Sequence, residues 1–351
     1  MKKIKIKICN YDPNDKCSYG HYFLQILKRH YEVELSENPD YLFYNESTYE
    51  HLKYDCIKIF YTGENITPNF NLCDYAIGFD YMEFEDRYYR LPIYLVANFY
   101  RPGEISQQNN AKFTDQLSFT HNDLSHKTDF CSFVYSNYLG DSTREEFFTK
   151  LSMYKKVNAG GAYLNNVGGR VENKLDFETK HKFSIAFENS SRNGYTTEKL
   201  PTALMAKTIP IYWGNPLINE EFNEERFVNC HAYKNFDEVV ERIKEIDNDD
   251  DVYLKMINQP VSTTYDFDEI QTGFESFLKK IIDQPIQLAQ RRTINPMRKR
   301  ELEKNEGVVA RYARRKSLST KVLATMYQPF KKSKLLDRLK QKYLKYKSLK
   351  K

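Results

Sequence analysis

The segment spanning residues 182–214 constrains the fold more than any other part of the chain. It begins with a largely apolar run at 183–187, continues through a polar loop at 188–195, and ends with a second apolar run at 208–213. Short apolar runs of this length are typical of buried strands. Strand, polar loop, short helical stretch and second strand together predict a βαβ unit of a parallel sheet.

The loop of this unit lies where parallel sheets bind ligands, at the carboxyl end of a strand. Thr196 and Thr197 can cap a helix that we expect to begin at one of them, with Glu198 and Lys199 in its first turn. Pro201 is tolerated there because first-turn N–H groups have no helical partner. Free N–H groups and a lysine at a helix start predict a site for a phosphate-bearing ligand such as a nucleotide.

Strand and helix patterns alternate along most of the chain, which predicts an α/β fold with two Rossmann-like halves facing across a cleft. We expect domains at 1–128 and 129–290, followed by a tail at 291–351. Residues 101–128 are polar and lack periodicity, which indicates a loop or connection. The expected strands are 3–9, 31–35, 41–44, 57–61 and 130–135, and the expected helices are 20–30, 144–154, 236–245 and 267–283, the last two closing the second half.

The net charge of +5 hides an asymmetry between the tail and the rest of the chain. Residues 291–351 contain 21 Lys and Arg against four acidic residues, which leaves the remainder near −12. Within the tail, leucines and tyrosines at 331–351 recur at nearly helical spacing among lysines, which predicts an amphipathic helix on an anionic membrane surface. Nucleic-acid binding by a basic arm is the alternative.

Other sequence features indicate where in the cell we expect the protein and whether we expect it to bind a metal. No run of 18 apolar residues predicts a membrane-spanning helix, and lysines interrupt the apolar region that a signal peptide needs at the N-terminus. The six cysteines are scattered without a CxxC pair or a Cys/His cluster, which disfavours a zinc site and suits reduced thiols. We therefore expect a cytoplasmic protein that is peripheral on the inner membrane.

Three motifs carry a resemblance to a known family. They are FEN, GYTTEKL and IPIYWG within 182–214, FYTGENITPNFNLCDYAIGFDYMEFEDRYYRLPIY at 60–94, and FVYSNYLGDSTREEF at 133–147. In this order and spacing they resemble the α1,3/4-fucosyltransferases of glycosyltransferase family 10, especially those of Helicobacter, from about residue 3 to about residue 285. The resemblance implies the GT-B fold, a donor half that binds GDP-fucose, and an acceptor half that binds N-acetyllactosamine-type glycans and gives Lewis x-like products.

The resemblance also carries donor-binding roles onto residues at matching motif positions, namely Arg144, Asn189, Tyr195, Glu198, Lys199 and Tyr61. Lys199 and Arg144 would compensate the charges of the diphosphate, and Glu198 would bind a ribose hydroxyl because it repels phosphate. Taken singly, the same residues fit ordinary roles as well. Glu198 and Lys199 could form a solvated pair, Tyr195 could pack in a core, and Arg144 could belong to a surface ion-pair cluster.

An inverting transfer by single displacement needs a base that takes the proton from the acceptor hydroxyl. Glu64 follows the strand at 57–61, Gly63 before it permits a tight turn, and the resemblance places the general base at Glu64. Glu188 is the competing carboxylate, and we expect it to stabilise positive charge on the sugar or to bind fucose hydroxyls. The alternative for Glu64 is a loop carboxylate that accepts hydrogen bonds from nearby N–H groups.

The sequence indicates less about the acceptor site and about whether the protein needs a metal. Tyr81, Tyr88 and Tyr89, with the charged residues between them, form a polar and aromatic stretch suited to a sugar. The acidic run at 247–251 follows a helix rather than a strand and therefore indicates a solvated turn, not a metal site. Arg144 and Lys199 can compensate the negative charge of the donor, so we expect no metal and no other cofactor. The alternatives are another nucleotide sugar, an α1,4 preference, or a non-catalytic nucleic-acid-binding protein.

Overall fold

The structure, a computed structural model, describes residues 1–10, 12–14, 19–100, 117–137, 140–261, 267–293 and 295–327. It divides into two compact units. The first comprises Met1–Glu46 and Tyr54–Arg292, and the second comprises Ser47–Lys53 and the chain from Thr293 onward. The two predicted halves therefore belong to one compact unit, and each unit is described by itself.

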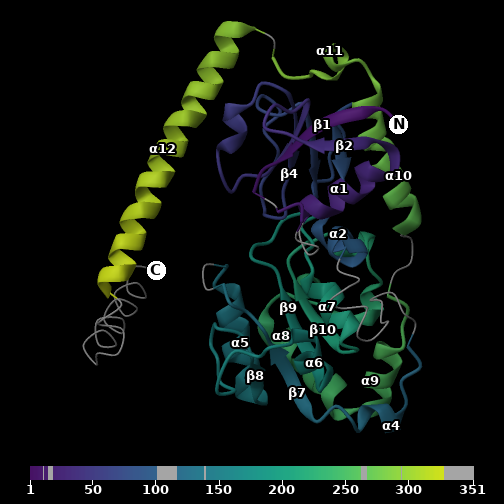
Figure 1. The fold of residues 1–351 in the computed structure, drawn as a ribbon. Helices are drawn as coiled ribbons and strands as arrows, with labels where there is room; N and C mark the ends of the chain where they lie inside the picture. The colour runs from purple at the N-terminus through teal and green to yellow at the C-terminus, as the bar shows by residue number, and fades with distance from the viewer. Residues whose placement is uncertain are drawn as a thin grey trace. The chain divides into compact units, whose positions relative to one another are not determined.

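The N-terminal sheet of the first unit is parallel throughout its described pairs (Figure 1). Its order is β2-β1-β3-β4-β5-β6. In β1, every second side chain is buried, because Ile4, Ile6 and Ile8 face the core while the lysines between them face outward. The strands are β1 (Lys3–Ile8), β2 (Glu32–Leu35), β3 (Tyr41–Tyr44), β4 (Ile57–Tyr61), β5 (Tyr75–Gly78) and β6 (Tyr88–Arg90).

The second sheet of this unit is also parallel, with the order β11-β10-β9-β7-β8. Its central strand β9 is buried at six of seven positions, which explains the continuous apolar run in its sequence. The strands are β7 (Asp129–Phe133), β8 (Val157–Ala159), β9 (His181–Phe187), β10 (Ile209–Trp213) and β11 (Val228–Asn229). The predicted α/β class and the βαβ unit at 182–214 are confirmed.

The pairing of β9 with β10 brings two loop residues together at the carboxyl edge of the second sheet. Phe187 lies opposite Trp213, so the residues that follow these strands, Glu188 and Gly214, are neighbours in space. The Glu188 N–H group donates to the Trp213 carbonyl at 2.8 Å. The loop after β9 is thereby anchored at the sheet edge where ligands bind in such folds.

In the first unit, helices cover the sheets and connect their strands, whereas α12 belongs to the second unit (Figure 1). Their bounds are α1 (Tyr19–His30), α2 (Ile93–Tyr100), α4 (His121–Leu124), α5 (Thr143–Tyr154), α6 (Lys174–Thr179), α7 (Lys199–Met205), α8 (Phe236–Asn248), α9 (Asp250–Ile257), α10 (Phe267–Asp283), α11 (Ile286–Ala289) and α12 (Pro296–Tyr327). Of the predicted connection at 101–128, residues 101–116 lie outside the described residues. The part at 121–124 is a short helix whose start is capped by Thr120.

Two predictions about helices are wrong. Helix α7 begins at Lys199 with Glu198 as its N-cap, and not at Thr196 or Thr197, because Thr197 donates its hydrogen bonds to Glu188 instead. Helix α10 does not close the second half. Its residues Phe274 and Ile281 pack in the core of the first sheet. The prediction failed because an amphipathic pattern shows that a helix is covered on one side but not which sheet covers it.

The structure describes only part of the predicted tail. Helix α12 occupies the start of the tail, and the proposed amphipathic segment at 331–351 lies outside the described residues. Of the helices that the structure describes, none combines the length and the apolar character required to cross a bilayer.

Candidate nucleotide-sugar site

The turn between β9 and α7 is built around the fully buried carboxylate of Glu188. Its Oε1 accepts the N–H group of Thr197 at 2.7 Å, and its Oε2 accepts the Thr197 hydroxyl at 2.6 Å and lies 3.1 Å from Lys199 Nζ. Gly214 leaves the room for this arrangement, because a Cβ there would overlap the Glu188 side chain. Both Glu188 oxygens are thus engaged within the protein.

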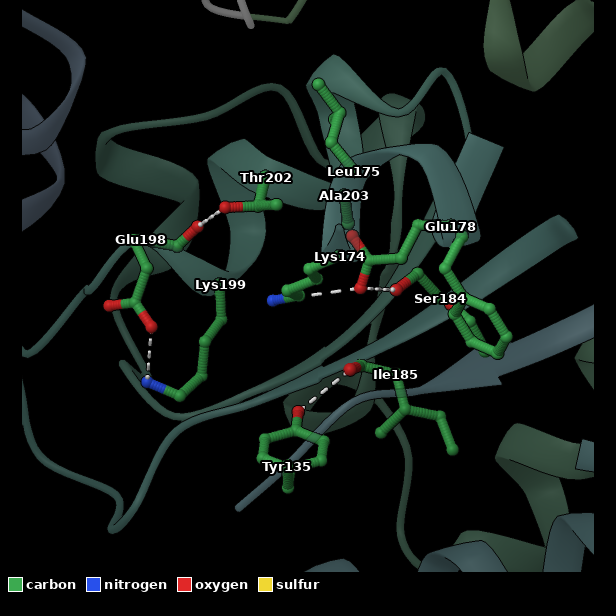
Figure 2. Close-up of polar contacts among 12 residues, drawn as sticks. Tyr135, Lys174, Leu175, Glu178, Ser184, Ile185, Glu198, Lys199, Thr202 and Ala203 are labelled. Carbon is green, nitrogen blue, oxygen red and sulfur yellow. Dashed lines mark hydrogen bonds and ion pairs between the residues drawn. The ribbon is translucent and has the colours of Figure 1, made fainter. Parts of the chain in front are cut away.

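Lys199 is the first residue of α7, and its ammonium group is fixed by three oxygens. Besides Glu188, its Nζ donates to Thr197 Oγ1 at 2.7 Å. It also lies 3.3 Å from Glu198 Oε1, as Figure 2 shows. Burial lowers the pKa of Lys199, but the carboxylates of Glu188 and Glu198 outweigh that effect and hold the pKa above its usual range. The site therefore contains a positive charge at the start of a helix, held between the carboxylates of Glu188 and Glu198.

Arg144 supplies a second cation from the first turn of α5, and this one is buried, with only 1% of it exposed. Its Nη2 donates to the Phe187 carbonyl at 2.8 Å and to Asn189 Oδ1 at 2.7 Å, and the guanidinium lies 4.3 Å from the centre of the Tyr135 ring. Within the described part of the chain, Nη1 has no hydrogen-bond partner and no carboxylate forms an ion pair with Arg144. A buried guanidinium with a free N–H group is suited to an anion.

The remaining residues of the turn are packed around these cations. Asn189 accepts from Arg144 through its side chain and from the Asp141 N–H group through its carbonyl. Tyr195 is buried, with its ring 5.0 Å from that of Phe79, and burial with the charge of Glu188 raises its pKa.

Glu198 has a partly exposed side chain beside Lys199. Burial raises the pKa of Glu198, but Lys199 and Lys174 exert the stronger, opposite effect, so the carboxylate stays ionised at neutral pH. Lys174 begins α6 and lies 3.7 Å from the buried Glu178, which also accepts the Ser184 hydroxyl at 3.0 Å (Figure 2). Sequence reasoning missed Lys174, since a lysine at a short helix start carries no signal of its own.

Of the six predicted donor-binding residues, five lie at or next to this turn, and Tyr61 does not. Tyr61 is fully buried, and its ring packs 5.1 Å from that of Tyr19 and 5.2 Å from that of Phe23. Its place in the core of the N-terminal sheet gives no geometric support to a donor-binding role.

The shape of the turn depends on Gly194 and Asn215. Gly194 has a φ of +80°, which L side chains rarely adopt, and a Cβ there would overlap the carbonyl oxygen of Phe79. The buried amide of Asn215 accepts the Gly194 N–H group at 2.7 Å and the Leu217 N–H group at 2.9 Å. Asn215 was missed as well, although it directly follows the IPIYWG motif.

Glu64 follows β4, as predicted, and its side chain is exposed. Its N–H group donates to Thr62 Oγ1 at 3.0 Å, which fixes the backbone of the loop. Desolvation and then the neighbouring carboxylate of Glu46 raise the pKa of Glu64, while the charge of Lys199 opposes them. The charge of Glu198 acts in the same direction as that of Glu46.

Direct contacts join the loop of Glu64 to that turn. Asn65 Nδ2 donates to Ser190 Oγ at 2.6 Å, and Arg192 Nη1 donates to Asn65 Oδ1 at 3.2 Å. These contacts bring the loop that carries the exposed Glu64 to the turn that carries Lys199. Chemically, this arrangement can hold a diphosphate leaving group and deprotonate an alcohol beside it.

The predicted aromatic stretch does not form one surface. Tyr88 is buried and donates to the Asp80 carbonyl at 3.0 Å, and Tyr89 donates to the Ile270 carbonyl at 2.7 Å. Tyr81, by contrast, is 42% exposed and can contact a ligand. The alternation of buried and exposed tyrosines was not visible in a stretch with so many charged residues.

The acidic run at 247–251 is not simply a solvated turn. Asp249 caps α9, but Asp247 is buried and its Oδ2 lies 2.9 Å from Lys155 Nζ, while its Oδ1 lies 3.1 Å from Lys182 Nζ. Burial raises the pKa of Asp247, and the lysines outweigh this and lower it. Asp247 thus forms structural ion pairs within the second half of the chain.

Comparisons with known proteins agree with this geometry. Residues 6–97 match the domain described as "Alpha-(1,3)-fucosyltransferase FucT N-terminal domain", and residues 124–267 match "Glycosyltransferase family 10 (fucosyltransferase) C-term". A crystal structure of an α1,3-fucosyltransferase with GDP-fucose superposes with a TM-score of 0.65 at 31% identity, covering 82% of this chain and 93% of that one. This chain belongs to glycosyltransferase family 10.

Two curated proteins of this kind extend the comparison. The α-(1,3)-fucosyltransferase FucT of Helicobacter pylori is 36% identical over 269 residues, which are 69% of this chain and 56% of that protein. A putative fucosyltransferase of Acanthamoeba polyphaga mimivirus is 31% identical over 186 residues, or 48% of this chain and 31% of that protein. The chain thus spans about half of the first relative and less of the second. The GT-B fold expected for a family 10 fucosyltransferase is confirmed.

Proposed function

We propose that this family 10 member transfers L-fucose from GDP-fucose to a GlcNAc hydroxyl of N-acetyllactosamine-type glycans, in α1,3 linkage. The observation that carries the proposal is the pair of cations at the edge of the second sheet, the largely buried Lys199 and the fully buried Arg144. A structural relative was solved with GDP-fucose, which supports the same donor here. Lewis x-like products would follow from this acceptor.

The donor would be held by its diphosphate. Arg144 Nη1 has no hydrogen-bond partner among the described residues, and Lys199 offers an ammonium group at the start of α7, so both would compensate the charge that grows on GDP as it leaves. Glu198 would accept a ribose hydroxyl, while Asn189 and Tyr195 would shape the pocket around the nucleotide sugar. Because two fixed cations do this work, we propose that the reaction needs neither a metal nor another cofactor.

The transfer would be a single displacement with inversion. Glu64 would take the proton of the acceptor hydroxyl as that oxygen forms its bond to the anomeric carbon, and the bond to the GDP oxygen would break with its electron pair leaving on the phosphate. Glu188 was expected to contact the sugar. Its two oxygens are engaged by Thr197 and Lys199, which supports a positioning role through the lysine instead.

The basic tail suggests where the enzyme would act. We propose that residues 331–351 bind anionic lipid of the inner membrane from the cytoplasmic side, and that the tail does not serve nucleic acid. The support is compositional, because lysines and apolar residues alternate at helical spacing.

A donor screen tests the proposed reaction. The protein is incubated with N-acetyllactosamine and GDP-fucose, UDP-sugars or CMP-sugars, with and without EDTA, and the products are identified by mass spectrometry and NMR. We expect fucose transfer from GDP-fucose alone, in α linkage to the 3-hydroxyl, unchanged by EDTA. Faster turnover of another nucleotide sugar, or loss of activity in EDTA, would refute the corresponding part of the proposal.

A further inference from the structure

A hollow of about 640 Å³ in the first unit has no role in donor binding as described above. Its wall combines residues after β5, such as Asp80 and Tyr81, with Arg192 and Asn193 from the turn after β9 and with Leu217. The volume lies within the roughly 300–1,000 Å³ typical of small-molecule sites. The hollow is therefore large enough for a sugar ring.

The wall of this hollow contains an acceptor for hydrogen bonds that the protein leaves unused. Asp80 Oδ1 pairs with Arg192 Nη2, while Asp80 Oδ2 is buried and has no hydrogen-bond partner among the described residues. A buried carboxylate oxygen without a donor is costly, and a ligand hydroxyl would satisfy it. The ion pair with Arg192 also cancels the local charge, which favours an uncharged ligand.

An aromatic ring adds the apolar surface that a sugar needs. Tyr81 is held from two sides, since its hydroxyl donates to Glu221 Oε1 at 2.7 Å and the guanidinium of Arg90 lies 4.0 Å from its ring centre. The ring is nevertheless 42% exposed and lines the hollow. A rigid, partly exposed tyrosine offers contact area at a low entropic cost.

The hollow lies next to the proposed base. Arg192, which pairs with Asp80, also donates to Asn65, and Asn65 directly follows Glu64. The Thr67 hydroxyl, in the same loop, accepts from Arg192 and lines the hollow. A sugar ring in the hollow would thus lie next to the loop that carries Glu64, where the reacting sugar would present its hydroxyl.

We propose that this hollow binds the second, non-reacting pyranose of the acceptor glycan, an uncharged sugar such as galactose. Tyr81 would contact its apolar face, and Asp80 Oδ2 would accept one of its hydroxyls. This inference rests on the proposed fucosyl transfer and specifies how a disaccharide acceptor is distinguished from a monosaccharide.

Kinetics with two acceptors test the proposal. The ratio of kcat/KM for N-acetyllactosamine to kcat/KM for a GlcNAc glycoside measures the contribution of the second ring. We expect the wild-type protein to favour the disaccharide, and Tyr81→Ala to reduce the ratio by roughly fivefold to tenfold, as for a lost aromatic contact. The kcat/KM for the monosaccharide and the KM for GDP-fucose should stay unchanged.

A blocking variant gives a second route that removes no described contact. Ser191 is exposed and lines the hollow, so Ser191→Trp should fill it and lower the ratio, whereas Ser191→Ala should not. Tyr81→Phe keeps the ring and should retain the preference. Tyr312→Ala removes an exposed tyrosine from the second unit and serves as the matched control.

The outcomes separate this inference from the proposed function. An unchanged ratio in both Tyr81→Ala and Ser191→Trp would overturn the inference, as would a higher KM for GDP-fucose without a change in the ratio. Calorimetry of both acceptors in the presence of GDP provides the same comparison without turnover. Disaccharide binding that depends on Tyr81, in a protein that transfers no fucose, would support the hollow and refute the proposed function.

Discussion

Lys199 is held by a buried carboxylate and, in the proposed reaction, also compensates the charge of a diphosphate. The two tasks are compatible because Glu188 is fully buried while 12% of the Lys199 side chain remains exposed. Removing one partner of such a pair leaves the other charge buried and unpaired. The effect of a substitution on folding must therefore be separated from its effect on binding.

Replacing Lys199 by methionine should affect both folding and binding. We expect Lys199→Met to lower the free energy of unfolding by about 3 kcal/mol, because it leaves the Glu188 carboxylate without its cation. GDP affinity, measured by calorimetry, should fall at least about tenfold. In the double variant Glu188→Gln/Lys199→Met, stability in urea should recover while GDP affinity stays low. Recovery of both would exclude a direct contact between Lys199 and the diphosphate.

The proposed base makes a prediction about pH. Glu64 must be ionised to accept a proton, and desolvation together with Glu46 raises its pKa, so activity should fall on the acid side at a pH above the ordinary titration of glutamate. Glu46→Gln removes one cause of the raised pKa and should shift this acid limb of kcat/KM to lower pH. Glu64→Ala should reduce kcat by about 10²–10⁴ with GDP affinity retained. An acid limb that does not move in Glu46→Gln, or a normal kcat in Glu64→Ala, would remove Glu64 from the mechanism.

At the scale of elements, the site depends on one turn whose backbone is fixed at its middle and at both ends. Glu188 fixes its start through Thr197, the Glu198 carbonyl fixes its end by accepting the Thr202 N–H group, and Gly194 takes a conformation that other residues rarely adopt. The sequence predicted this βαβ unit because β9 and β10 are buried parallel strands and appear as short apolar runs.

Other elements could not be predicted for physical reasons. The apolar face of α10 would suit packing on either sheet, so only the folded structure shows that Phe274 packs against the first sheet. Asp247 looks exposed in an acidic run and is buried only because Lys155 and Lys182 reach it from other elements. The contact of Arg192 with Asp80 joins residues 112 positions apart, which no local pattern encodes.

Two glycines give a matched test of the turn. Gly194→Ala should lower both the melting temperature and GDP affinity, because the new Cβ meets the Phe79 carbonyl and φ is positive. Gly169→Ala is the control, since nothing lies within 4 Å of a Cβ there and its φ is not in the left-handed region. Thermal unfolding and calorimetry measure the two effects. Equal behaviour of both variants would show that the turn tolerates another backbone conformation.

At the scale of the whole molecule, the chain combines an acidic body, residues 1–290, with a basic tail, residues 291–351. The compact unit that ends at Arg292 contains both sheets and the candidate site, while the chain from Thr293 onward belongs to a second unit. The two parts therefore can be tested separately, although the proposed lipid-binding segment lies outside the described residues.

Truncation after Tyr327 should separate location from catalysis. We expect the shortened protein to lose sedimentation with anionic vesicles, because each Lys or Arg near such a surface contributes about 1 kcal/mol. Its kcat/KM for N-acetyllactosamine in solution should match that of the full chain. Vesicles of neutral lipid and a DNA oligonucleotide serve as controls. Retention of binding to DNA but not to anionic vesicles in the full chain would favour a nucleic-acid arm.

A crystal structure of the full chain with GDP-fucose tests the central claim most directly. The account predicts that the diphosphate contacts Lys199 Nζ and Arg144 Nη1, with the anomeric carbon on the side of Glu64. A nucleotide bound away from the turn at 189–199, or a fucose whose anomeric carbon faces away from Glu64, would contradict it.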